Sequence, residues 1–185
     1  MEWGGKSGVK KEEKGMKRRF WETAVVLMCL AIGFAASAGA QTGNRGGPVI
    51  SRSFASRAIS PGSTWKVYIN ASAPGGGMTS IYATVLQPGV GQYPVSITKL
   101  KEENQKGFSG FIYLSTFSPQ GSLDGISLIL TVQIKDHTDT FSEPAVFPLE
   151  IQSRASPEAP PPGVFREQGL GPIMVTLRPV LPHRG

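Results

Sequence analysis

The stretch ISLILTVQIKD, residues 126–136, decides the fold class of this chain. Aliphatic side chains occupy every second position of it: Ile126, Leu128, Leu130, Val132 and Ile134. Successive side chains of a β-strand point to opposite faces of a sheet, so a period of two predicts a strand with one buried face. This is the cleanest alternation in the sequence, and we expect the strand to be central in its sheet.

Shorter alternating runs flank this stretch on both sides and are separated by turn residues such as Gly, Pro and Ser. They cover residues 50–58, 64–72, 79–87, 93–100, 108–115 and 145–151. Together they make about seven short strands in about 100 residues, which is typical of an all-β sandwich or barrel. We expect one such domain over residues 50–153. Trp65 alternates with Val67 and Ile69, which predicts that it lies in the core.

Two positions within this pattern carry further information. Pro144 and Pro148 favour an edge position for the last strand of the domain, because proline cannot donate to a sheet ladder. The charged segment KEENQK, residues 101–106, predicts an exposed hairpin loop before the run at 108–115. That run carries large apolar side chains on both faces, so we expect both of its faces to be covered.

The N-terminus has the layout of a secretory signal peptide over residues 1–40. A basic segment, MKRR at 16–19, is followed by the uncharged apolar run AVVLMCLAIGFAA at 24–36 and then by Ala38-Gly39-Ala40. Small residues at Ala38 and Ala40 predict cleavage before Gln41. An uncleaved anchor is the alternative, but the apolar run is shorter than the roughly 20 residues that span a bilayer. We therefore expect a start at Met16, a periplasmic or secreted protein, and no membrane span after cleavage.

Cysteine content and charge indicate the source of the protein and the class of partner that it lacks. Cys29 is the only cysteine and lies inside the apolar run, so the cleaved chain has no disulfide and depends on its core, which favours a bacterial source. The net charge of the whole chain is +6, and residues 41–185 keep +3 of it. A charge this small gives no reason to expect nucleic-acid binding, which usually involves a clustered basic face.

Three segments together resemble bacterial extracellular immunoglobulin-like domains. They are TWKVYI at 64–69, TVQIKD at 131–136 and FSEP at 141–144. The resemblance covers residues 50–152 and implies a single immunoglobulin-like antiparallel β-sandwich of the fibronectin-III, cadherin or polycystic-kidney type. Domains of this group often turn through a glycine after the Asp; here the turn is Asp136–Thr140 and lacks one. Such folds host many unrelated functions, so the resemblance implies little about activity.

The residues that could carry chemistry are few. The loop SAPGGG at 72–77, where calcium-binding relatives of this fold hold an ion, has no carboxylate. Its first residue completes the glycosylation-type triplet Asn70-Ala71-Ser72, and the loop predicts a tight connection between two strands. Asp136, His137 and Asp139 could hold an ion, but a polar turn explains them equally well. GFSG at 107–110 falls short of a nucleophile motif, and His183 lies in the terminal tail. We expect no metal site, no cofactor, no catalytic residue and no enzyme activity.

The ends of the predicted domain differ from its body. Residues 41–49 are glycine-rich and predict a flexible lead, whereas residues 154–185 predict a Pro-rich linker and a tail with a candidate strand at 173–178. That strand either folds back onto the sandwich edge or adds to the sheet of a partner. Its candidate partner-binding residues are Ile173, Met174, Val175 and Leu177.

The function that these observations favour is a non-catalytic extracytoplasmic module for binding or scaffolding at the cell envelope, with a protein or a glycan as partner. An aromatic patch could serve such a partner, although aromatic residues in strands usually pack in the core or cover its rim, which is the favoured interpretation for each of these: Trp65, Tyr68, Tyr82, Tyr93 and Tyr113. The alternatives are an assembly or chaperone-like subunit that uses its C-terminal strand for β-augmentation, and an accessory domain of a partner enzyme.

Overall fold

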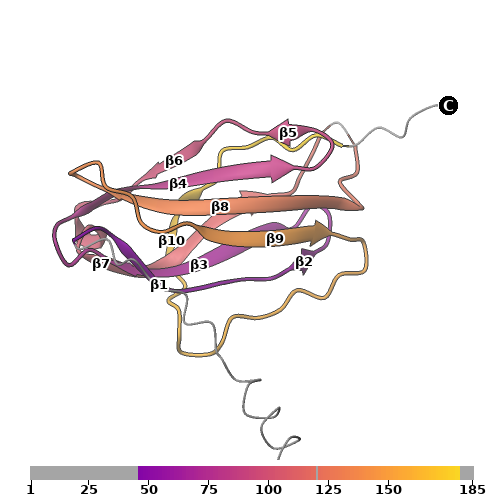
Figure 1. Ribbon diagram of the computed structural model, residues 1–185. Helices are drawn as coiled ribbons and strands as arrows, with labels where there is room; N and C mark the ends of the chain where they lie inside the picture. The colour runs from indigo at the N-terminus through magenta and orange to yellow at the C-terminus, as the bar shows by residue number, and fades with distance from the viewer. Residues whose placement is uncertain (1–45, 120, 180–185) are drawn as a thin grey trace, which may run out of the picture. The chain divides into compact units, whose positions relative to one another are not determined.

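The alternating stretch at 126–136 forms β8 (Ile126–Asp136) at the middle of a six-stranded sheet. The computed structural model describes residues 46–119 and 121–179, and predictions for residues 1–45 and 180–185 fall outside them. The sheet has the order β2-β9-β8-β4-β5, and β6 also pairs with β4. Its other strands are β2 (Ala58–Ile59), β4 (Met78–Gln87), β5 (Gly91–Gln92), β6 (Ser96–Lys99) and β9 (Ala145–Ile151). The central position of β8 is thus confirmed (Figure 1).

A four-stranded sheet in the order β1-β3-β7-β10 faces the first one (Figure 1). Its strands are β1 (Val49–Ala55), β3 (Thr64–Ser72), β7 (Gly107–Ser115) and β10 (Gly169–Pro172). The pair β3–β7 is antiparallel along its whole length, from Thr64 opposite Ser115 to Ser72 opposite Gly107. Parallel pairing occurs at two sheet margins, where β10 meets β7 and β2 meets β9.

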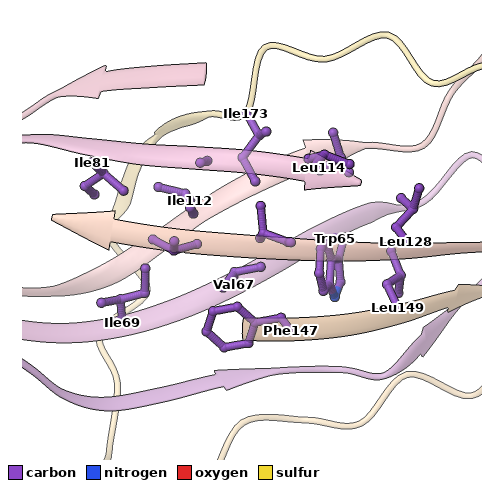
Figure 2. Packing of buried hydrophobic residues seen from close by; sticks show 14 of the residues in the cluster. Trp65, Val67, Ile69, Ile81, Ile112, Leu114, Leu128, Phe147, Leu149 and Ile173 are labelled. Atoms are coloured by element: carbon purple, nitrogen blue, oxygen red, sulfur yellow. The ribbon is translucent and has the colours of Figure 1, made fainter. Parts of the chain in front are cut away.

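The core lies between the two sheets and is built from their inward-facing side chains. Figure 2 shows Trp65, Val67 and Ile69 of β3 against residues of the other sheet such as Leu128 and Phe147. Trp65 is 1% exposed, and its indole Nε1–H donates a hydrogen bond of 2.8 Å to the carbonyl oxygen of Ser56. Its prediction as a core residue is confirmed, and burying an aromatic with a satisfied N–H is strongly favourable.

One of the predicted strands is divided in the structure, and another is shorter than predicted. The run at 50–58 forms β1 and β2, which belong to different sheets, because the chain changes sheet at Ser56 and Arg57. The run at 93–100 forms only β6, and β5 lies just before it. Pro94 explains this second break, since it cannot donate to the ladder with β4. The predicted strands therefore existed, but their bounds were wrong at both places.

The segment 101–106 is a crossover between the sheets, so the prediction of a hairpin was wrong. The predicted exposure is confirmed for its four charged residues. It joins β6 to β7 and contains a single 3-10 turn, η1 (Glu102–Asn104), whose Asn104 is buried. The glycine-rich connection between β3 and β4 crosses beside it. Met78 N–H donates to the carbonyl oxygen of Gln105 at 2.6 Å, and Ala73 N–H donates to that of Lys106 at 3.2 Å. The tight connection expected at 72–77 is thus confirmed, and it is bonded to its neighbour.

The last sandwich strand, β9, is an edge strand for most of its length. It pairs with β8 throughout, whereas β2 reaches only Glu150 and Ile151 on its other side. Pro148 lies opposite Ile129 of β8 in the part that β2 leaves open. The predicted edge position is therefore confirmed for Ala145–Leu149. The predicted cover on both faces of β7 is also confirmed, because its residues from Phe108 to Leu114 are all buried or half-buried.

The C-terminal strand is not where the alternation at 173–178 placed it. The strand that forms is β10, just before it, and residues 173–179 belong to no strand. The chain turns after one further ladder bond: Ile173 N–H donates to the carbonyl oxygen of Tyr113 at 2.7 Å, and then Val175 N–H donates back to Ile173. At the other end, β1 begins at Val49, inside the predicted flexible lead.

Candidate partner-binding surfaces

Residues 158–179, here called the strap, cross the outer face of the four-stranded sheet. In Figure 1 the chain leaves β9, runs back past β2 and β1, and reaches β10 beside β7. The strap begins where the backbone N–H of Glu158 donates to Ser56 Oγ at 3.0 Å. Farther along, the side-chain amide of Asn70 donates to the carbonyl oxygen of Val164 at 2.9 Å. The strap is therefore attached to β3 before it reaches β7.

On β7 the strap continues through backbone contacts. Arg166 N–H donates to Ser109 Oγ at 2.9 Å, and Phe111 N–H donates to the carbonyl oxygen of Gln168 at 2.8 Å. The fit is close at Gly110, where an added Cβ would lie 2.6 Å from the Gln168 carbonyl oxygen. Ser109, the serine of the motif-like GFSG stretch, thus accepts a hydrogen bond from the strap.

A small polar cluster joins the strap to β3. The carboxylate of Glu167 accepts hydrogen bonds from Lys66 Nζ at 2.8 Å and from the Tyr68 hydroxyl at 2.6 Å. The pKa of Glu167 is held below its ordinary value mainly by the hydrogen bond from Lys66 and secondarily by the one from Tyr68. In turn, the hydrogen bond to Glu167 raises the pKa of Lys66. Burial first, and the bond to Glu167 second, raise the pKa of Tyr68. The Phe165 ring covers Tyr68 with their centroids 5.6 Å apart.

The end of the strap is held by the core and by the six-stranded sheet. Ile173 and Leu177 are 4% and 1% exposed and belong to the core cluster; Figure 2 shows Ile173 pointing between the sheets. Gln87 Nε2 donates to the carbonyl oxygen of Arg178 at 2.7 Å, and Arg178 N–H donates to the Tyr93 hydroxyl at 3.0 Å. The strap thus connects the open edges of the two sheets.

The four residues predicted to bind a partner therefore do not share one exposed face. Ile173 and Leu177 are in the core, Val175 is half-buried, and Met174 is 75% exposed. The fold-back alternative describes their arrangement in this structure. The predicted cleavage residues Ala38, Ala40 and Gln41 lie outside the described residues.

A second surface is the outer face of the six-stranded sheet, which carries exposed apolar side chains. We call it the apolar face and define it by six residues: Tyr82, Leu86, Ile97, Ile129, Phe141 and Val146. Leu86 lies opposite Ile129 on β8, and Tyr82 lies opposite Ile97 on β6, which places each pair on the same side of the sheet. Val146 and Ile97 are 57% and 52% exposed.

The aromatic pair of the apolar face is set edge to face. The rings of Tyr82 and Phe141 meet at 78° with their centroids 5.0 Å apart. Lys135 Nζ lies 5.8 Å from the Tyr82 centroid and 2.6 Å from Asp139 Oδ1, which raises the pKa of Lys135. Sequence reasoning named only Tyr82 among these residues. The available signal was the presence of aliphatic residues at outward positions, such as Ile129 between Leu128 and Leu130.

The five aromatic residues considered from the sequence do not form one patch. Trp65 is in the core, Tyr68 lies under the strap, and Tyr93 bonds to its end. The Tyr113 ring lies beside that of Phe111 on the four-stranded sheet, tilted by 59° with the centroids 6.3 Å apart. Tyr82 alone lies on the apolar face. A cavity of about 150 Å³ is present where the start of the strap crosses Tyr68, with Phe54, Pro157 and Pro160 among its lining residues.

The turn from Asp136 to Thr140 is organised by the Asp136 carboxylate. Its Oδ1 accepts hydrogen bonds from Thr138 N–H at 2.8 Å, Thr138 Oγ1 at 2.7 Å and Thr140 N–H at 2.9 Å. Burial alone would raise the pKa of Asp136, but these bonds outweigh it and lower the pKa. Asp139 has a φ of 64° and so takes the left-handed conformation that glycine adopts most readily.

His137 and its neighbours complete the sites considered from the sequence. Its Nδ1 lies 3.0 Å from the carbonyl oxygen of Gly77, and its ring packs against Gly76. Among residues 46–119 and 121–179, no group of three His, Cys, Asp or Glu side chains is placed to hold a metal ion. Within the same ranges, no helix has the length and hydropathy needed to cross a bilayer.

No protein-family model matches the sequence, and no curated protein matches it. Among solved structures, the chain is similar to the PKD domain of an M14-like peptidase from a Thermoplasmatales archaeon, at 12% identity and a TM-score of 0.38, over 57% of this chain and 96% of that one. It is also similar to a CARDB domain from Pyrococcus furiosus solved in complex with di-metal ions, at 9% identity and a TM-score of 0.30, over 56% and 84%. These likenesses concern the fold alone. The two facing sheets of the structure confirm the expected all-β sandwich.

Proposed function

We propose that this protein is a non-catalytic extracytoplasmic module that binds another protein through its apolar face. The carrying observation is the group of exposed aliphatic and aromatic side chains on this face, which come from β6, β4, β8, β9 and the turn after β8. Apolar groups gathered on one face of a soluble domain commonly mark an interaction site, because covering them removes apolar area from water. The predicted signal peptide supports a place at the cell envelope for this binding or scaffolding role.

The geometry of the aromatic pair favours a protein over a glycan as the partner. A sugar ring stacks on the flat face of an aromatic side chain, and a strip of coplanar rings extends that platform. Tyr82 and Phe141 instead meet at 78°, so they present no common plane. Their neighbours Ile97 and Ile129 are aliphatic and suit the apolar side chains of a protein surface.

Co-purification from the cell envelope tests this proposal. The mature chain, residues 41–185, is immobilised as wild type and with Val146→Glu, which puts a charge on the apolar face. The matched control is Val49→Glu, at a residue 47% exposed on the four-stranded sheet, compared with 57% for Val146. We expect a protein that wild type and Val49→Glu retain and that Val146→Glu loses.

Four other outcomes would count against the proposal or favour one of its alternatives. A partner retained equally by all three chains would show that the apolar face does not bind it. Retention abolished by glycosidase treatment of the envelope fraction would identify a glycan instead. A catalytic protein among the retained partners would favour the accessory-domain alternative. Hydrolytic turnover by the purified chain, lost on substitution of His137, would overturn the non-catalytic assignment.

A further inference from the structure

The strap turns back on the sandwich at one four-residue turn, Pro161–Val164. Val164 N–H donates to the Pro161 carbonyl oxygen at 3.3 Å, and Gly163 has a φ of 73°. Proline at the second position and glycine with positive φ at the third are the features of a type II turn. Residues 159–163 make no hydrogen bond to the sandwich within the described structure. This short segment is therefore a hinge between two anchored parts of the chain.

The contacts on either side of the hinge are separable. Before it, Glu158 is bonded to Ser56; after it, the strap occupies a continuous site that extends from Tyr68 along β7 to Gln87. That site combines a charged partner for Glu167, backbone acceptors and donors on β7, and space in the core for Ile173 and Leu177. Every copy of the protein carries both this site and a strap that fits it.

We propose that the part of the strap after the hinge, residues 164–179, is exchanged between two copies of this chain, so that it docks along β7 of the other copy. The exchange opens the Pro161–Val164 turn, after which the proline run extends away from its own sheet as a stiff spacer. All docking contacts are kept, and the left-handed conformation of Gly163 is no longer required. Exchange of an identical element is a low-cost route to a dimer.

Concentration decides between the two arrangements. A strap tethered by a short linker docks on its own sandwich at an effective concentration in the millimolar range. Dilute refolding is therefore expected to give monomers, whereas refolding at about 1 mM protein gives exchanged dimers that persist on dilution. This proposal is independent of the apolar face, which lies on the other sheet.

Cysteine trapping between copies tests the exchange directly, since residues 41–185 contain no cysteine. One chain carries Ser109→Cys and the other carries Arg166→Cys; the Ser109 hydroxyl oxygen lies 2.9 Å from the Arg166 nitrogen. Neither chain can close this bridge alone, so a covalent heterodimer after joint refolding and mild oxidation requires exchange. The control replaces Ser109→Cys with Thr131→Cys, on the outer face of the other sheet.

We expect the heterodimer to form at high protein concentration in the first pair and only at background level in the control. A single chain with both Ser109→Cys and Arg166→Cys, refolded dilute, reports whether the two positions can bridge. If that chain closes and the mixed pair gives no heterodimer above background, exchange is refuted. If it does not close, size-exclusion chromatography decides, and a monomer after refolding at every concentration refutes the proposal.

The hinge has a matched control within the same chain. Gly163 and Gly89 have φ values of 73° and 82°, and a Cβ added at either residue would have no atom within 4 Å. Gly163→Ala penalises only the closed turn, so the dimer fraction should rise about fivefold or more. Gly89→Ala has the same backbone cost in the β4–β5 turn and should leave the fraction unchanged. Equal dimer fractions in both variants would contradict the assignment of the hinge.

Discussion

Truncating Ile173 to alanine should cost this domain as much stability as a change in the middle of its core. The residue is 4% exposed although it lies beyond the last strand, in the strap. The substitution removes three carbon groups at about 0.8 kcal/mol each, or about 2.5 kcal/mol of transfer free energy. The cavity left behind raises the loss to about 3–4 kcal/mol. Met174→Ala is the matched control at 75% exposure, and it should change stability by less than about 0.5 kcal/mol.

The strap adds an upper limit to this loss. If the truncated strap detaches, the cost cannot exceed the free energy with which the strap docks. Leu177→Ala, at a residue 1% exposed, removes part of the same docking free energy. The double variant Ile173→Ala/Leu177→Ala should therefore lose clearly less than the sum of the two single losses. The shortfall measures how far the strap acts as one unit.

Urea unfolding gives the measurement, with fluorescence of Trp65 as the readout. Trp65 is the only tryptophan after residue 40, and it is 1% exposed, so its emission should shift to the red on unfolding. With a slope of about 1–3 kcal/mol per molar urea, Ile173→Ala should lower the midpoint by about 1–4 M. A loss no larger than that of Met174→Ala would refute the placement of the strap end in the core. A chain truncated at Ala159 gives the limit of complete strap removal.

Three further predictions concern the strap and the turn after β8. Gly110→Ala should lower stability by about 1–3 kcal/mol in urea unfolding, because the added Cβ would lie 2.6 Å from the strap backbone. Gly107→Ala on the same strand is the control and should cost less, because its Cβ would lie 3.4 Å from the nearest atom. The lowered pKa of Glu167 contributes stability above pH 4.5 that is lost as pH falls, and the raised pKa of Lys66 contributes stability below pH 10.5 that is lost as pH rises. The raised pKa of Tyr68, which also bonds to Glu167, contributes stability that is lost as pH rises above 10.0. In a pH series of melting temperatures, the small deficit of Glu167→Gln relative to wild type should therefore be constant between pH 4.5 and pH 10.0 and shrink outside these limits. Asp136→Ala should lower the free energy of unfolding by about 1–3 kcal/mol at neutral pH, since three accepted hydrogen bonds disappear. This loss should diminish below pH 3.8, and a loss that does not depend on pH would contradict the lowered pKa of Asp136.

The sequence predicts those parts of the fold in which side chains alternate over many residues. The stripe from Ile126 to Ile134 and the run Trp65-Val67-Ile69 each placed a strand and its buried face correctly, because the period of a strand is a property of its own residues. The strand β10 has the sequence GLGP and pairs through its backbone, so it has no such pattern to read.

What could not be predicted depends on contacts between distant segments. The sequence alternates as a strand would at Ile173, Val175 and Leu177. The chain nevertheless turns at Met174, because Ser96 Oγ accepts a hydrogen bond from the Met174 N–H and the ladder with β7 ends at the Tyr113 carbonyl oxygen. The apolar face was missed for a related reason. Ile129 and Val146 lie on the same face only because the register of β8 with β9 puts them opposite Pro148 and Thr131, and no local pattern specifies that register.

The position of the strap at the C-terminal end of the chain has a consequence for biosynthesis. A ribosome delivers β3 and β7 long before residues 169–177, so β7 keeps one side without a partner strand until the final part of the chain emerges. An unpaired strand edge is a template for aggregation. Nascent chains, and chains cut within the proline run, should therefore depend on chaperones in a way that the completed protein does not. The last residues to be synthesised are therefore the ones that cover the open edge of β7.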